Sequence, residues 1–101
     1  MYVIQILLPL YDNAGLRFEA PAYSDVRTQL TDACGGLTAY SRAPAEGHWE
    51  RNGDVKRDDI VVFEVMTSEL DEQWWAAYRT KLESLFRQDS IVIRVQECKI
   101  L

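Results

Sequence analysis

Three short apolar runs in this chain are each interrupted by a single long polar residue. The runs are Val3–Leu8, Ile60–Met66 and Ile91–Val95, and the interruptions are Gln5, Glu64 and Arg94. Side chains alternate between the two faces of a strand, so each run has one wholly apolar face and one face with a single polar group. A sheet of such strands usually has both faces covered, so the pattern favours helices on one side and a second surface on the other.

The size and charge of the chain limit what it can bind. Its 101 residues fit one domain, residues 1–101, which would bury roughly 65% of the surface of the unfolded chain. The formal net charge of −5 works against binding to phosphate backbones, which depends on Lys and Arg displacing counterions. We therefore expect neither nucleic acid nor membrane as a partner.

The amino-terminal residues predict a strand and not a targeting segment. The apolar run Tyr2–Leu10 has no basic leader and ends at Pro9–Asp12 without a cleavage pattern, so we expect a cytoplasmic protein. No stretch approaches the ~20 apolar residues that span a bilayer.

The sequence predicts no metal and no cofactor. Cys34 and Cys98 are too few for a disulfide framework and lack the paired spacing of a zinc site, so they are expected to be buried thiols. The acidic residues Asp54, Asp58 and Asp59 lack the glycine and terminal glutamate of a calcium loop. The chain also has no Gly-rich phosphate loop and no nucleophile elbow, so hydrolase chemistry is unsupported.

Periodicity and turn residues predict six elements in the order βαββαβ. Helical spacing follows Pro21 and returns after Ser68 and Asp71, which resemble a capping box, while Gly35 and Gly36 end the first helix. Strands are expected at Val3–Leu10, Leu37–Arg42, Asp59–Met66 and Ser90–Leu101, and a polar excursion at Ala43–Asp59 holds an Asn52–Gly53 hairpin turn.

Right-handed crossovers in both halves give an α+β, ferredoxin-like domain. Its four-stranded antiparallel sheet has the order 4-1-3-2 and carries both helices on one face. Over essentially the whole chain this order of elements resembles the dimeric α/β-barrel superfamily. The resemblance implies a homodimer in which two subunits pack their helix-free sheet faces together. The segment from Gly35–Tyr40 to Gly47–Trp49 also resembles small bacterial proteins of unknown function.

The three interrupting residues fall side by side in this strand order. Strand 1 lies between strands 4 and 3, so Arg94, Gln5 and Glu64 form a row on the helix-free face. In one interpretation the row belongs to a dimer interface, where Glu64 and Arg94 pair within or across subunits because buried charge needs a partner. In the other, Glu64, Arg94, Gln5 and Tyr40 line a ligand or acid–base site, which orients an anionic or carbonyl-bearing molecule.

The remaining candidates are a histidine and aromatic residues. His48 stands beside Trp49 on the polar excursion, where it either flanks an anchoring tryptophan or acts as a general base over a cleft. Trp74 and Trp75 point about 100° apart on a helix, so one packs in the core while the other covers an edge or lines a pocket.

Two functions stay open. The first is a small-molecule binder or cofactor-independent enzyme, and the second is a non-catalytic dimerisation or protein-interaction module. For the first, the catalytic candidates are His48, Glu64 and Arg94, and the ligand-binding candidates are Gln5, Tyr40, Trp49, Trp75 and Tyr78.

Overall fold

The computed structural model describes residues 1–34, 39–51 and 54–101, and describes side chains for residues 1–34 and 60–101. Within these ranges the elements are β1 (Tyr2–Pro9), α1 (Ala20–Cys34), β2 (Ala39–Arg51), β3 (Asp54–Thr67), α2 (Glu72–Leu85) and β4 (Val92–Glu97). The predicted α+β class and βαββαβ order are confirmed. No helix in the described part is long and apolar enough to cross a membrane.

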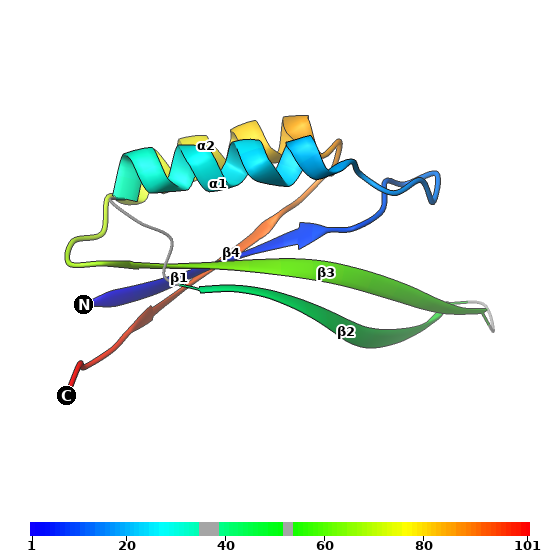
Figure 1. Cartoon of the computed structure of the whole chain (residues 1–101). Helices are drawn as coiled ribbons and strands as arrows, with labels where there is room; N and C mark the ends of the chain where they lie inside the picture. The colour runs from blue at the N-terminus through cyan, green and yellow to red at the C-terminus, as the bar shows by residue number, and fades with distance from the viewer. Residues whose placement is uncertain (35–38, 52–53) are drawn as a thin grey trace.

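The strands pair antiparallel in the spatial order β2-β3-β1-β4. Both helices lie over one face of this sheet, and no described element covers the other (Figure 1). We call the uncovered side the bare face. Its described residues are Val3, Gln5 and Leu7 of β1, Val62, Glu64 and Met66 of β3, and Val92, Arg94 and Gln96 of β4.

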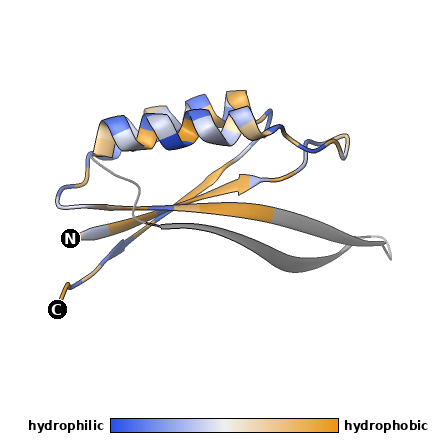
Figure 2. Cartoon of the chain, viewed as in Figure 1, coloured by the Kyte–Doolittle hydropathy of each residue, from blue (hydrophilic) through white to orange (hydrophobic). Residues whose placement is uncertain are grey.

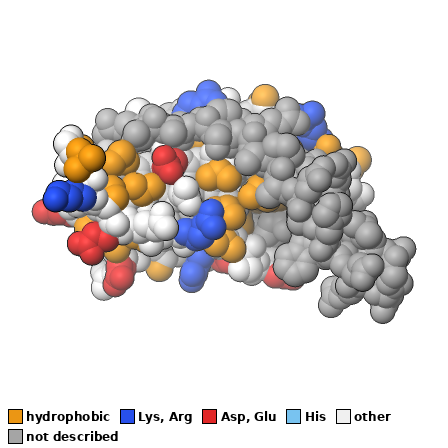
Figure 3. Space-filling model, turned by 90° about the horizontal axis from the view of Figure 1, so that it is seen from below, with side chains coloured by type: hydrophobic (Ala, Val, Ile, Leu, Met, Phe, Trp, Pro, Cys, Tyr) orange, Lys and Arg blue, Asp and Glu red, His pale blue; other side chains and the backbone are white. Residues whose placement is uncertain are grey.

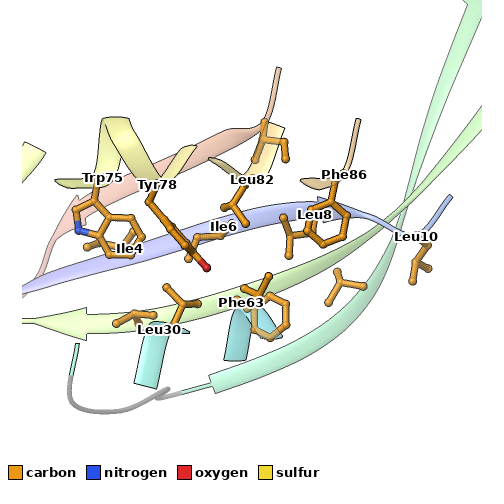
Figure 4. Close-up of a cluster of buried hydrophobic side chains, with 14 residues drawn as sticks. Ile4, Ile6, Leu8, Leu10, Leu30, Phe63, Trp75, Tyr78, Leu82 and Phe86 are labelled. Atoms are coloured by element: carbon orange, nitrogen blue, oxygen red, sulfur yellow. The ribbon is translucent and has the colours of Figure 1, made fainter. Parts of the chain in front are cut away.

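The core lies between the helices and the covered face of the sheet. Ile4, Ile6 and Leu8 alternate along β1 and are fully buried, and the central strands are correspondingly apolar (Figure 2). Phe63 and Leu82 meet them from β3 and α2 (Figure 4). Full burial of each such side chain stabilises the fold by about 1.5–3 kcal/mol, so this alternation fixes which face of the sheet turns inward.

Helix α2 has a side-chain cap at its amino end and a backbone cap at its carboxyl end. Asp71 is its N-cap, and the carboxylate accepts the Trp74 N–H over 3.1 Å. The predicted capping role of Ser68 is wrong, because β3 runs on to Thr67 and leaves Ser68 exposed in the bend that follows. At the other end the N–H of Gln88 donates to the carbonyl of Glu83 over 2.9 Å, as in a Schellman motif.

The hairpin of β2 and β3 is longer than the hydrophobic pattern predicts. The backbone of the polar excursion Ala43–Asp59 pairs as strand on both arms, with a register shift between Ala43 and Gly47. Antiparallel pairing satisfies backbone N–H and C=O groups whatever the side chains are, so polar residues extend the ladder here. The predicted Asn52–Gly53 turn lies outside the described residues. At the other edge β4 is shorter than predicted, ending at Glu97.

Candidate functional site

The bare face combines apolar side chains with charges of both signs. Val3, Leu7, Val62 and Met66 are partly buried, while Val92 is 50% exposed. Figure 3 views the molecule from this side and shows hydrophobic side chains lying beside acidic and basic ones. A surface that combines apolar side chains with charged groups of both signs is typical of a face that meets another molecule.

Gln5 stands at the centre of the predicted row. Its backbone pairs with Glu64 on one side and with Arg94 on the other. The amide Nε2 of Gln5 donates to Oε1 of Glu64 over 3.0 Å, so the carboxylate is held in a fixed position. The structure therefore brings Glu64, Gln5 and Arg94 together as neighbours across three strands.

The two charges of the row do not neutralise each other. Glu64 and Arg94 are separated by β1, which puts their backbones roughly 10 Å apart at the usual strand spacing. Among the described residues no ion pair joins them, and Arg94 is exposed. The predicted pairing within one subunit is wrong for this reason, and only the pairing across subunits stays a prediction.

The candidates on β2 are described by backbone register alone. Ala39, and not Tyr40, pairs with Glu64, while Tyr40 pairs with Phe63. Positions paired across antiparallel strands share a face of the sheet, so this register puts position 40 on the face of Phe63, and the expectation that Tyr40 joins Glu64 on the helix-free face is wrong. His48 pairs with Arg57 and Trp49 with Lys56, and the side chains of all three candidates lie outside the described residues.

Trp75 and Tyr78 lie on the opposite side of the sheet from the row. They are 7% and 6% exposed and pack in the core beneath α2. The Tyr78 hydroxyl donates to Oε1 of Gln29 over 3.0 Å, tying α2 to α1. The structure thus separates these two ligand candidates from Gln5, Glu64 and Arg94, and the predicted residues do not form one site.

Burial beside the aromatic residues of α2 raises the pKa values of Tyr78 and Cys34. Trp74 stacks on Tyr78 with ring centroids 5.0 Å apart and 21° between the planes. Burial, with a smaller contribution from the charge of the Cys34 thiolate, raises the pKa of Tyr78 to about 12. Burial likewise raises the pKa of the Cys34 thiol, so the thiol stays neutral near pH 7 and is a poor nucleophile.

The cysteines form neither a disulfide nor a metal site in the described part of the chain. Cys34 and Cys98 are both free and partly buried. No group of three or more His, Cys, Asp or Glu side chains within residues 1–34 and 60–101 is arranged to hold a metal ion.

Sequence reasoning missed a surface cavity of about 560 Å³ where α1 ends and α2 begins. Thr67, Glu69, Trp74 and Trp75 are among its lining residues. The sequence feature that corresponds to the cavity is the mainly polar stretch 67–71, which joins a buried strand to an aromatic helix and so brings polar groups beside apolar side chains. From the sequence, this stretch is assigned only a role in capping the helix.

The sequence matches no family model and none of the curated proteins. The solved structure of a phage SAM lyase in complex with S-methyl-5′-thioadenosine is similar in fold, with a TM-score of 0.61. The likeness covers 95% of this chain and 80% of that one at 16% identity, so it shows a shared fold alone. The resemblance to small bacterial proteins stays a prediction.

Proposed function

We propose that the protein is a ferredoxin-like homodimer whose bare sheet faces pack together and hold a small, partly apolar molecule at the charged row. Read from β4, the strand order is the 4-1-3-2 arrangement expected of a dimeric α/β-barrel subunit. The observation that carries the proposal is the row of Glu64, Gln5 and Arg94 on an apolar face that no described element covers.

The row is complementary to itself under one two-fold operation. An axis parallel to the strands and midway between two facing sheets reverses the row, so Glu64 of one subunit lies over the partner's Arg94. Gln5 then meets the partner's Gln5 on the axis. An axis parallel to the row would set like charges against each other, which is unfavourable. The charge pattern therefore favours a single relative orientation of the two subunits.

The same residues suit a small ligand at the seam. The side-chain amide of Gln5 holds the Glu64 carboxylate in place, and the exposed Arg94 guanidinium has donors for an anionic or carbonyl group. Apolar neighbours such as Leu7 and Val62 offer contact to the rest of the molecule. The similar phage structure holds S-methyl-5′-thioadenosine, a partly apolar molecule whose ring nitrogens and hydroxyl oxygens can also accept from a guanidinium, which makes that compound a suitable probe.

The proposal is tested by neutralising each end of the row. Glu64→Gln and Arg94→Met keep side-chain size, and Lys81→Met on α2 is the control for loss of a cation away from this face. Mass by light scattering and titration with S-methyl-5′-thioadenosine are measured on each. Reduced dimerisation or reduced probe binding in the row variants, with the control unchanged, is expected. Wild-type mass and probe binding in both row variants would contradict it.

A non-catalytic pairing module is the second candidate. It is favoured by the packing of Trp75 and Tyr78 in the core, where they line no space facing the row. Under this alternative the row fixes the register of the dimer and binds nothing else. Dissociation of the Glu64→Gln and Arg94→Met variants, together with no probe binding by the wild type, would assign the protein to this class.

A further inference from the structure

We infer that the cavity at the junction of α1 and α2 is a binding site for a small organic cation with an aromatic or alkyl body and a hydrogen-bond-accepting group. This site is separate from the charged row and does not depend on dimerisation. At about 560 Å³ the cavity falls within the range of small-molecule sites.

The walls of the cavity are apolar and aromatic. Trp74 and Trp75 meet at a steep angle, with ring centroids 4.7 Å apart and 81° between the planes. Met66 and Cys34 line the same space, and the thiol is neutral near pH 7 because burial raises its pKa. Two indoles set at this angle offer a corner that contacts a flat or branched body on two sides.

The cavity wall also carries an unused hydrogen-bond donor. Trp75 is 7% exposed, and Nε1 of its indole keeps contact with solvent and makes no hydrogen bond with another described residue. The nitrogen lies on the side of the ring turned away from Tyr78 and Leu82 (Figure 4), and Trp75 lines the cavity. A solvent-accessible indole N–H at the wall of a cavity can donate to an acceptor group of a ligand.

A second polar group at the wall is unsatisfied. The hydroxyl oxygen of Thr67 is buried and has no hydrogen-bond partner among the described residues. Thr67 lines the same cavity, and rotation about its χ1 angle redirects the hydroxyl. The cavity wall therefore has one buried hydroxyl without a partner and one indole N–H that is open to an acceptor.

The charge of the cavity selects cations. Its charged groups in the described part of the chain are the carboxylates of Glu69 and Asp71 and the α-ammonium group of Met1, which also lines the cavity. The Asp71 carboxylate is already engaged by the Trp74 N–H, but Glu69 is exposed and makes no bond with another described residue. The Met1 ammonium contributes one positive charge and the amino end of α2 about half of one, and the two carboxylates outweigh this sum. A cation here also gains from the indole faces.

The test uses two probes that differ only in the ammonium group, L-phenylalaninamide and 3-phenylpropanamide. At pH 6 the α-amino group of the first is protonated, and both carry an amide carbonyl that accepts from an indole N–H. Titrations are followed by ¹H–¹⁵N NMR, with the Trp75 indole signal assigned from the Trp75→Phe variant. We expect the cationic probe to move that signal and to bind about three- to tenfold more tightly.

Substitutions that remove one carboxylate charge at constant side-chain size test which residue causes the tighter binding of the cationic probe. Glu69→Gln is expected to remove most of the advantage of the cationic probe, while Asp25→Asn, the same charge change at an exposed position of α1 outside the cavity, leaves it intact. Equal affinity for both probes, or an unmoved Trp75 signal at saturation, would overturn the inference. Shifts centred on Gln5 and Arg94 would also overturn it, because they would place binding at the charged row.

Discussion

The side-chain amide of Gln5 holds the carboxylate of Glu64 by a 3.0 Å hydrogen bond across the β1–β3 pair. The bond satisfies one carboxylate oxygen, and the guanidinium of Arg94, on the other flank of Gln5, has no counter-charge among the side chains described in residues 1–34 and 60–101. A fixed acid and an exposed base on one apolar face form a pattern that a second copy of the chain can complete.

A charge placed on the bare face should weaken self-association and leave the fold intact. In Val92→Lys the new ammonium is solvated in the monomer, where Val92 is 50% exposed, but becomes buried between two faces in the dimer. We expect the dimer dissociation constant to rise at least about tenfold. Leu85→Lys is the matched control, since Leu85 is 52% exposed on α2. Equal effects of the two substitutions on sedimentation would exclude the bare face as the contact surface.

Removing Asp71, the observed N-cap of α2, should destabilise the protein more than removing Ser68, to which the sequence pattern assigns a capping role. Asp71→Ala leaves the Trp74 N–H without its acceptor and should lower the free energy of unfolding by about 1 kcal/mol. Ser68→Ala should change it by less than about 0.5 kcal/mol, because Ser68 is exposed in a bend. Urea unfolding of both variants measures the difference, and a larger loss for Ser68→Ala would restore the capping box.

Position 87, the second residue after α2, should favour glycine over alanine. Arg87 has φ 50° at the left-handed position of the Schellman motif, where a Cβ atom costs about 1 kcal/mol. Arg87→Gly and Arg87→Ala both lose the contact of the guanidinium with Asp12, so their difference isolates the backbone. We expect the glycine variant to be about 1 kcal/mol more stable in urea unfolding. An alanine variant of equal or greater stability would show that the left-handed conformation carries no cost.

Alkaline pH should destabilise the fold through Tyr78. Its pKa is raised from 10 to about 12 in the folded protein, so between these values the unfolded chain loses the phenol proton that the folded chain keeps. The stabilisation is complete below pH 10 and is lost as pH rises toward 12. Tyr78→Phe should lose about 1 kcal/mol at pH 9, where Gln29 lacks its donor, but should show a smaller further loss at pH 11.

Urea unfolding at pH 9 and pH 11, at one protein concentration, compares the two proteins. An equal loss of stability between these pH values in wild type and Tyr78→Phe would mean that the proton on Tyr78 does not couple to folding.

The core side of the sheet could be predicted because alternation in β1 and β3 is strict. Ile4, Ile6 and Leu8 are buried as a set, and the polar Gln5 between them falls on the opposite face. The same regularity set Gln5 between Glu64 and Arg94, since register follows from the buried face once the strands pair. The α+β class and the order of the elements follow from local periodicity.

The hydrophobic pattern of the sequence could not predict features that depend on backbone pairing or on single side-chain contacts. The long polar arms of β2 and β3 are held by ladder hydrogen bonds, which leave no hydrophobic signal. The offset that pairs Ala39 with Glu64 is set by the hairpin, so the place of Tyr40 was missed. The aromatic pattern of Trp75 and Tyr78 suits a core and a pocket equally, and only the packing shows that both lie in the core while Trp75 also lines the cavity between α1 and α2.

Charge exchange across the row tests the central claim most directly. Under the two-fold arrangement, Glu64→Arg sets two cations against each other at each end of the seam, and Arg94→Glu sets two anions against each other. The double variant restores opposite charges. Sedimentation velocity should give a dimer for the wild type, monomers for both single variants and a dimer again for the double variant. A monomeric wild type at every concentration, or single variants with wild-type mass, would contradict the account.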